Sequence, residues 1–304
     1  MGNTHNLKLI ILIIVAASLV LIGSCMFVVT MSIAKWDFSL LGTPIEATTH
    51  TPSEDFYSIS VVTSSADVTF LPSEDESCRV VCVDQKNLTH SVTVVDGVLK
   101  IEKVDTRSWY DYISIFSRPT GVTVYLPKSE YASLYVESFT SDVKLASGFT
   151  FGSIDIFLST GDIDAEGIST GWLNLSVSTG TIRAKSINCS TEMLVSVSTG
   201  DVRLTDVTCG VLTSSGTTGD ITLTNVIASE SFSIERSTGD VRLDSCDAPT
   251  VNVKTGTGDV HGTLLSEKIF STSTTTGRVN VPRSASGGSC NISTTTGNIS
   301  IEIK

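Results

Sequence analysis

The sequence predicts an all-β fold: a single-stranded right-handed parallel β-solenoid with about 19–20 residues per coil, preceded by one transmembrane helix. Three observations carry this prediction. A Thr-Gly pair recurs at a nearly constant interval, apolar residues alternate on both sides of it, and a long apolar run lies near the start of the chain. The glycines that we expect to form structural corners are Gly161, Gly180, Gly200, Gly219, Gly239, Gly258, Gly277 and Gly297.

Each repeat has the pattern of a strand, a corner and a second strand. Thr precedes every corner glycine, and Ile or Val follows two residues later, as in the segment 199–202 (Thr-Gly-Asp-Val). Apolar and polar residues alternate on both sides, which is the period of a strand with one buried face. A glycine at a fixed corner predicts a positive φ, which β-branched residues resist.

A single coil of this kind cannot bury its inward side chains, so successive coils must stack. Equivalent strands would then pair in parallel about 4.8 Å apart. An antiparallel sandwich is the alternative, but it gives no reason for alternate turns to match in sequence. We expect about a dozen coils, a rod on the order of 60 Å. The last strand, 299–304, would leave an open edge that Glu302 and Lys304 guard or that a partner strand extends.

Residues 9–33 form the predicted transmembrane helix, because roughly 20 apolar residues span a bilayer. A lipoprotein signal with Cys25 as the lipidated residue is the alternative, although the apolar run continues well past it. Lys8 precedes the run and Lys35 follows it, so the positive-inside rule only slightly favours a cytoplasmic N-terminus. The prediction is a single-pass plasma-membrane protein with a cytoplasmic tail (1–8), a spacer (34–57) and an extracytoplasmic C-terminal domain.

The C-terminal domain divides into irregular N-terminal coils (58–150) and regular β-solenoid repeats (151–304). Within the irregular part, 78–83 is a predicted strand and 92–101 a predicted hairpin around Asp96-Gly97. We expect an aromatic insertion to cap the open end of the core, with a membrane-interface or partner-binding loop as the alternative. Its residues are Trp109, Tyr110, Tyr112, Ile113, Ile115 and Phe116.

The most distinctive motif is Ser-Thr-Gly-Asp-Val-x-Leu, found at 198–204 and again at 237–243, with Val-Tyr-Leu-Pro at 124–127 before it. With these residues the chain resembles, over about residues 57–304, the bacterial putative-adhesin domain family of Gram-positive envelope proteins. The resemblance implies a solenoid tethered to the cell membrane. It carries no agreed catalytic or binding residues, so none is transferred.

Carboxylates recur directly after the corner glycines. Stacking would place one carboxylate per coil in a column, and calcium binds through six to eight oxygens. The candidate calcium column is Asp201, Asp220, Asp240 and Asp259. The simpler interpretation is that each carboxylate bonds its own turn backbone. Nearby counter-charges would then be Arg183, Arg203 and Arg242.

Other chemistry is poorly supported by the sequence. The net charge of −12 argues against nucleic acid as a partner. The four histidines are scattered and no nucleophile or phosphate-loop motif occurs, so we predict a protein that is not an enzyme and has no cofactor. Cys189 and Cys209 lie one coil apart, within disulfide range, and free thiols are the simpler expectation.

Together these features predict a membrane-anchored, non-enzymatic scaffold or adhesin-like recognition module of the cell envelope. Its partners would be the membrane and a protein or glycan of the envelope. Two alternatives remain: a regulatory subunit of an envelope-stress sensing system, and a rod that binds calcium or glycans.

Overall fold

The computed structural model describes residues 3–33, 36, 45–108 and 119–304, and the chain forms two units. One unit comprises Met1–Pro44 with Arg107–Arg118, and the other comprises Ile45–Thr106 with Pro119–Lys304. The predicted aromatic cap, residues 109–116, lies outside the described residues.

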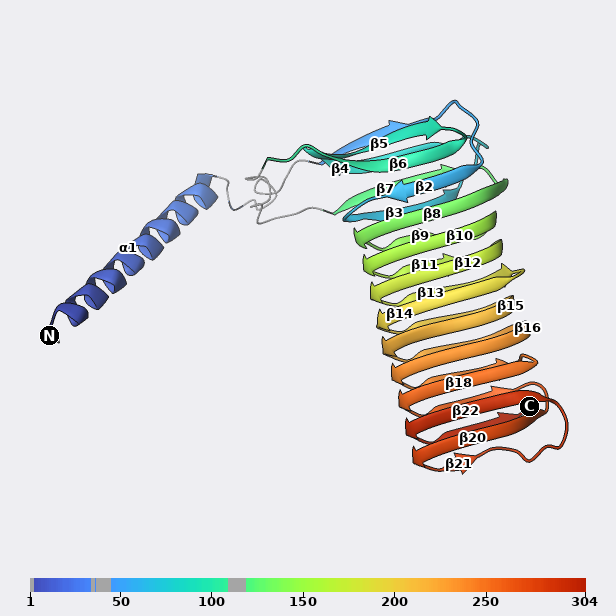
Figure 1. Cartoon of the computed structure of the whole chain (residues 1–304). Helices are drawn as coiled ribbons and strands as arrows, with labels where there is room; N and C mark the ends of the chain where they lie inside the picture. Colours follow the sequence, from blue (N-terminus) through green and yellow to red (C-terminus); the bar gives the residue numbers. More distant parts are fainter. Residues whose placement is uncertain (1–2, 34–35, 37–44, 109–118) are drawn as a thin grey trace. The chain divides into compact units, whose positions relative to one another are not determined.

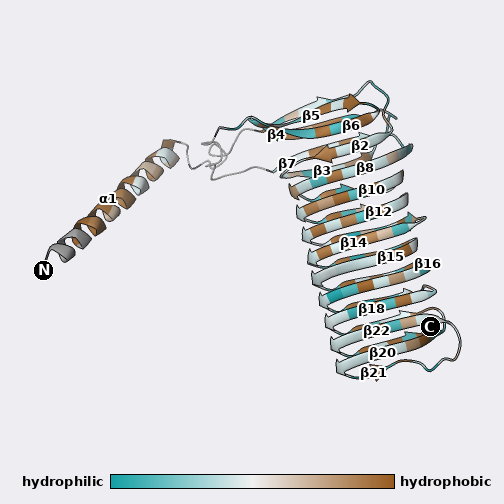
Figure 2. Ribbon diagram, in the orientation of Figure 1, coloured by the Kyte–Doolittle hydropathy of each residue, from teal (hydrophilic) through white to brown (hydrophobic). Residues whose placement is uncertain are grey.

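The first unit contains the helix α1 (Asn3–Ile33), which Figure 2 colours largely as hydrophobic. Its segment Ile10–Ile33 has a mean hydropathy of 2.8 and is long and apolar enough to cross a membrane. The hydroxyls of Ser18, Ser24 and Thr30 donate hydrogen bonds to the carbonyl four residues earlier, at 2.7–2.8 Å. Such bonds satisfy hydroxyls in an apolar medium. Cys25 lies inside this helix and is exposed.

The second unit is a parallel β-solenoid of about nine turns. The sequence prediction of a dozen coils was too high, because part of segment 58–126 forms antiparallel strands instead of further coils. The stack is therefore roughly 40 Å long. Its N-terminal strands are β1 (Ile45–His50), β2 (Ser58–Val62), β3 (Ala66–Pro72), β4 (Arg79–Gln85), β5 (Leu88–Val95), β6 (Val98–Asp105), β7 (Thr120–Leu126), β8 (Glu130–Thr140) and β9 (Val143–Leu145).

The regular coils follow, as the stacked ribbons of Figure 1 show. Their strands are β10 (Phe149–Thr160), β11 (Ile163–Glu166), β12 (Ile168–Thr179), β13 (Ile182–Cys189), β14 (Glu192–Thr199), β15 (Val202–Thr218), β16 (Ile221–Thr238), β17 (Val241–Cys246), β18 (Thr250–Thr257), β19 (Val260–Leu264), β20 (Lys268–Thr276), β21 (Val279–Asn280), β22 (Gly288–Thr296) and β23 (Ile299–Ile303).

Equivalent residues of successive coils pair in parallel. The strand segments that end at the Thr-Gly corners form one column, here called the pre-corner column, and those that follow form the post-corner column. Thr199, for example, pairs with Thr179 on one side and Thr218 on the other. The predicted stacking of the corners is thus confirmed, and inward side chains such as Leu175 and Val195 share one continuous buried core.

Gly219 shows why the corner needs glycine. Its φ is +124°, and a Cβ atom there would lie 2.1 Å from the carbonyl oxygen of Gly200 in the neighbouring coil. Both the backbone conformation and the close approach exclude a side chain. Gly277 is the exception among the eight corner glycines, because its φ lies outside the left-handed region.

A second corner, six residues after the first, escaped the sequence analysis. Ser186, Asp206, Asn225 and Ser245 occupy it in successive coils, all with φ of 53–55°. Asn, Asp and, less often, Ser tolerate this left-handed conformation. The signal was a small polar residue at a constant offset, which the alternating pattern around it concealed.

The ends of the stack do not follow chain order. The coil β22–β23 lies between β18–β19 on one side and β20–β21 on the other. At the other end, the coil β2–β3 lies between β6–β7 and β8–β9. The first and last coils of the sequence are therefore enclosed in the stack.

This arrangement corrects part of the predicted open edge. Residues 299 and 300 are not at the edge, since β23 pairs there with both β19 and β21. Residues 301–303 pair with β19 alone, and the terminal coil is β20–β21. The physical reason lies in the inward residues. Those of β22–β23 include Ile292, Ile299 and Ile301, all buried, whereas those of β20 include Thr272 and Thr274. The more apolar coil occupies the interior and the Thr-rich coil ends the stack, as solenoids require of a polar cap.

The structure also describes the predicted hairpin, the predicted spacer and the cysteine pair. The hairpin at Asp96-Gly97 is confirmed: β5 and β6 pair antiparallel from Val95 and Val98, with φ of 52° and 73° at the two turn residues. The predicted spacer contains a strand, β1, which pairs antiparallel with β4. Cys189 and Cys209 are buried and present as free thiols.

Candidate functional site

The aspartates after the corners form what we call the corner ladder. Asp220 N donates to Asp201 Oδ1 at 3.1 Å, Asp240 N to Asp220 Oδ1 at 2.9 Å, and Asp259 N to Asp240 Oδ1 at 2.8 Å. Each carboxylate thus accepts a hydrogen bond from the backbone of the next coil. The prediction from the sequence was a hydrogen bond to the backbone of its own turn. The column predicted for calcium is brought together, and one oxygen of Asp201, Asp220 and Asp240 is occupied by an amide.

The ladder continues to the end of the stack, where Asn298 N donates to Asp259 Oδ1 at 2.6 Å and Arg278 N donates to Asn298 Oδ1 at 3.0 Å. Arg278 follows the corner of the terminal coil, beyond which no further coil requires an acceptor. The terminal coil can therefore have Arg278 where other coils have aspartate. This agrees with the positions of the two coils, β20–β21 at the end of the stack and β22–β23 enclosed.

The predicted counter-charges pair only in part with the ladder. Arg203 contacts Asp201 at 2.7 Å and Arg183 contacts Asp162 at 2.9 Å, but Arg242 contacts Asp244 in its own strand. Burial opposes ionisation of Asp162, yet hydrogen bonds from Arg183 and from the Thr181 amide leave its pKa below the usual value.

Four aromatic side chains lie on the outer side of the pre-corner column, on β8, β10 and β12, two of them exposed and two half-buried. We call Tyr135, Phe139, Phe157 and Trp172 the aromatic face. Phe139 is 68 % exposed and Phe157 is 37 % exposed, and the ring centroids of Tyr135 and Phe157 are 6.0 Å apart. Strand alternation directs the side chains between them inward, including Leu134 and Val136. This face was not found from the sequence, because its members come from three different coils.

Hydrogen-bonding groups lie among these rings. Tyr135 donates its hydroxyl proton to Glu137 Oε2 at 2.6 Å, which raises the pKa of Tyr135 to about 12. Asn174 Nδ2 donates to Asp155 Oδ1 at 3.1 Å; Asp155 pairs in register with Tyr135 in one neighbouring coil and with Asn174 in the other. The aromatic face therefore offers ring surfaces beside carboxylate and amide groups.

The same outer side becomes a shallow polar groove further along the stack. Serine, asparagine and one ion pair line it, over β16, β18, β22 and β20. Asn291 Nδ2 donates to Asn252 Oδ1 at 2.9 Å, and Lys254 contacts Glu235 at 2.7 Å. The pre-corner column thus presents one outer side, aromatic at one end and amide-rich and hydroxyl-rich at the other.

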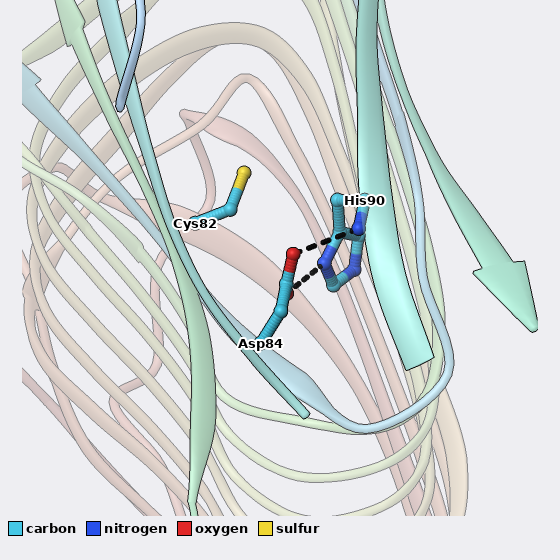
Figure 3. A group of neighbouring side chains, drawn as sticks. All are labelled: Cys82, Asp84 and His90. Atoms are coloured by element: carbon cyan, nitrogen blue, oxygen red, sulfur yellow. Dashed lines mark hydrogen bonds and ion pairs between the residues drawn. The ribbon is translucent and has the colours of Figure 1, made fainter. Parts of the chain in front are cut away.

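A separate buried cluster joins β4 and β5 at the N-terminal end of the stack. Figure 3 shows the side chains of Cys82 and Asp84, from one strand, beside that of His90. His90 Nδ1 lies 2.6 Å from Asp84 Oδ1, and the His90 amide donates to Asp84 Oδ2 at 2.8 Å. Thr63 Oγ1 lies 2.8 Å from His90 Nε2. All four residues are buried.

The scattered positions of the histidines along the chain gave no sign that His90 meets Cys82 and Asp84, so this cluster was not predicted. A weak signal existed, because Cys82 and Asp84 alternate along one strand and so share a face. Their meeting with His90 depends on the turn between β4 and β5, at Gln85 and Leu88, after which the two strands diverge into different columns. The alternation of residues in the sequence does not show that β4 and β5 enter different columns.

Two solved structures of bacterial proteins resemble this chain. One from Parabacteroides distasonis, described as a "putative lipid binding protein", has a TM-score of 0.55 and 14% identity, covering 86% of this chain and 98% of that one. One from Bacteroides fragilis, described as a "putative adhesin", has a TM-score of 0.49 and 14% identity, covering 85% and 97%. At 14% identity, the likeness to the Parabacteroides distasonis structure shows the fold alone. No curated protein matches the chain.

A family profile extends over most of the chain. The profile described as Toastrack DUF4097 matches residues 56–302, which includes every parallel coil from β2 to β23 and also the cluster at Cys82, Asp84 and His90. The repeat motifs that suggested a putative-adhesin solenoid all fall inside this range. The chain therefore belongs to the Toastrack DUF4097 family.

Proposed function

We propose that the protein is a membrane-anchored, non-enzymatic recognition module of the cell envelope, and that its aromatic face binds neutral or amino-substituted glycans. The observation that carries the proposal is the exposure of Phe139 and Phe157 beside Asp155 and Asn174 on an open, regular side of the solenoid. Exposed aromatic clusters on a soluble surface mark interaction sites.

The chemistry of the face favours sugars. An aromatic ring packs against the apolar face of a pyranose ring, while amide and carboxylate groups bond its hydroxyls. The outer side continues into the groove of serine and asparagine, whose groups also bond hydroxyls. A net charge of −12 disfavours polyanionic partners, so a neutral or amino-sugar polymer fits best.

The helix α1 supports anchoring. Its apolar segment Ile10–Ile33 is long enough to span a bilayer, and an uncleaved span would hold the solenoid at the outer surface of the plasma membrane. A membrane-fractionation experiment tests this part: the full chain should stay in the membrane fraction after a high-salt wash. Recovery of a shortened chain that lacks α1 would mean that the segment is a cleaved signal.

Retention on insoluble polysaccharides tests the recognition function. The detergent-solubilised full chain should be retained by a neutral or amino-sugar polymer such as chitin or peptidoglycan. Phe157→Ala and Trp172→Ala should weaken retention about tenfold each, in line with typical loss of an aromatic contact. Ile269→Ala, a substitution of an exposed apolar residue in the terminal coil, is the matched control. Equal retention of all three variants would refute the assignment of the aromatic face.

A further inference from the structure

We infer that Cys82, Asp84 and His90 form a zinc site at the N-terminal end of the solenoid. Each residue offers a ligand atom, and the three atoms lie within 4.8 Å of one another in a buried position. Thiolate, imidazole and carboxylate are the three side-chain ligand types that zinc takes. Tetrahedral zinc separates its ligand atoms by about 3.5 Å, so His90 Nδ1 and Asp84 Oδ1 would move apart from their present 2.6 Å, and any pair near the 4.8 Å limit would move closer.

Hydrogen bonds around the cluster already orient the ligands. His90 Nδ1 and Asp84 Oδ1, 2.6 Å apart, would both turn to the metal, and Thr63 Oγ1 would accept a bond from His90 Nε2. Asp84 Oδ2 is fixed by the His90 amide at 2.8 Å. Second-shell partners of this kind fix the tautomer of a ligating histidine. A water molecule would complete the coordination.

The thiol of Cys82 packs in the hydrophobic core and, among the described residues, makes no hydrogen bond, whereas Asp84 and His90 each make two or more. A thiolate and a carboxylate would balance the two charges of zinc, so the buried site would be neutral overall. The thiolate also selects zinc over calcium or magnesium, which prefer oxygen ligands.

Binding has a defined proton balance. The Cys82 thiol gives up its proton to solvent, and zinc takes the place of any proton on His90 Nδ1. Because these ligands bind zinc in their deprotonated forms, protons are released on binding and the affinity for zinc should rise with pH near neutrality.

The site would join two strands that separate from each other. β4 pairs with β7 and β1, and β5 pairs with β6, so the cluster links the post-corner and pre-corner columns where the stack ends. Zinc binding would stabilise the folded state at this end by mass action. This inference is independent of glycan binding, because the aromatic face lies on β8, β10 and β12.

Cobalt substitution tests the site directly. The full chain in detergent, stripped of metal by a chelator and then dialysed, is titrated with Co²⁺ and afterwards with Zn²⁺. We expect one equivalent of Co²⁺ with a thiolate-to-metal charge-transfer band in the near ultraviolet, displaced by Zn²⁺. Competition with a chromophoric chelator should give a zinc affinity that rises from pH 6.5 to pH 7.5.

The variant Cys82→Ser should lose the charge-transfer band and about 100-fold or more in zinc affinity, since loss of an outer-shell partner alone costs about 10–100-fold. Cys246→Ser, which removes a different fully buried thiol on β17, is the matched control and should keep both. Circular dichroism shows whether each variant is folded. A wild-type protein without the band, or with the band and affinity unchanged in Cys82→Ser, would overturn the inference.

Discussion

The carboxylate of Asp220 binds the next coil through one backbone amide, so its contribution should depend on an acceptor atom more than on charge. Asp220→Ala should lower the free energy of unfolding by about 1 kcal/mol, because the amide of Asp240 loses its partner. Asp220→Asn should cost less, since Asn298 serves naturally as an acceptor in the same ladder. Urea unfolding of the two variants measures the difference.

The calcium interpretation of the column predicts a different result. A cation would need the charges, so the triple variant Asp201→Asn, Asp220→Asn, Asp240→Asn would abolish a calcium-dependent rise in melting temperature. An amide ladder predicts no such rise in the parent protein and a modest loss of stability in the variant. The column itself was predictable from the period of the repeat. Its acceptor role was not, because the period does not say which way a carboxylate points.

Asp162 and Arg183 give the solenoid a pH dependence of known sign. The pKa of Asp162 is lowered in the folded state, so its contribution to stability is present above the ordinary value of about 3.9 and is lost as the pH falls through the lowered value. Arg183→Gln should therefore reduce stability at pH 7 by less than about 1 kcal/mol, since the pair is exposed. The difference from the parent should vanish below the folded-state pKa. Calorimetric melting at pH 7 and at acidic pH measures it, and an equal difference at both pH values would contradict the assignment.

Among the elements, β16 contains an unusual buried cation. Arg236 is 2 % exposed; its Nη1 donates to Val197 O at 2.8 Å, and within the described residues its Nε and Nη2 have no partner. Burial lowers the pKa of Arg236. Gly216, in the neighbouring coil, makes room for the guanidinium, since a Cβ there would lie 1.7 Å from Nη1.

Replacing this charge by an apolar side chain of similar length should be neutral or stabilising. We expect Arg236→Met to raise the free energy of unfolding by up to about 2 kcal/mol, because burying a guanidinium with two unbonded nitrogens costs more than the attraction of Asp201 and Asp220 returns. Arg236→Ala should be destabilising, because it leaves a void beside Gly216. Arg242→Met, the same substitution at an exposed arginine of the solenoid, is the control. Denaturant unfolding measures the free energies. A loss of stability in Arg236→Met would show that the charged guanidinium stabilises the folded state.

At the level of elements, the sequence predicted the strands around each Thr-Gly corner and the hairpin at Asp96-Gly97. These depend on local pattern: alternation of apolar residues and turn residues with positive φ. It did not reveal the second corner at Asp206 and Asn225, nor the inward direction of Arg236. An arginine at a position of alternating pattern is ordinarily an outward residue, and the glycine that accommodates it lies one coil earlier in the chain.

The solenoid as a whole departs from the predicted order at both ends. Repeats of 19–20 residues have nearly the same length and register, so a period by itself does not decide which coil lies next to which. The deciding feature is composition: the coil with Ile292 and Ile299 is enclosed, and the coil with Thr272 and Thr274 is terminal. The local sequence pattern therefore predicted the fold. The order of the coils at the two ends of the stack could be seen only in the structure.

The neighbour of β18 is the most direct test of this arrangement, on which the columns, faces and ends all depend. Asn252 pairs with Asn291, whereas chain order would place it beside Ser271, which pairs with Asn291 on the far side. Paired residues lie about 5 Å apart and residues two coils apart lie about 10 Å apart, so only the former can be joined by a disulfide.

Cysteines are introduced at 252 and 291, or at 252 and 271, in a background with Cys25→Ser and Cys78→Ser to remove the exposed and the half-buried thiol. The pair at 271 and 291 serves as the control for adjacent strands. After mild oxidation and proteolysis, mass spectrometry should find the cross-link between 252 and 291 and none between 252 and 271. A cross-link between 252 and 271, with none between 252 and 291, would contradict the enclosed position of β22 and β23.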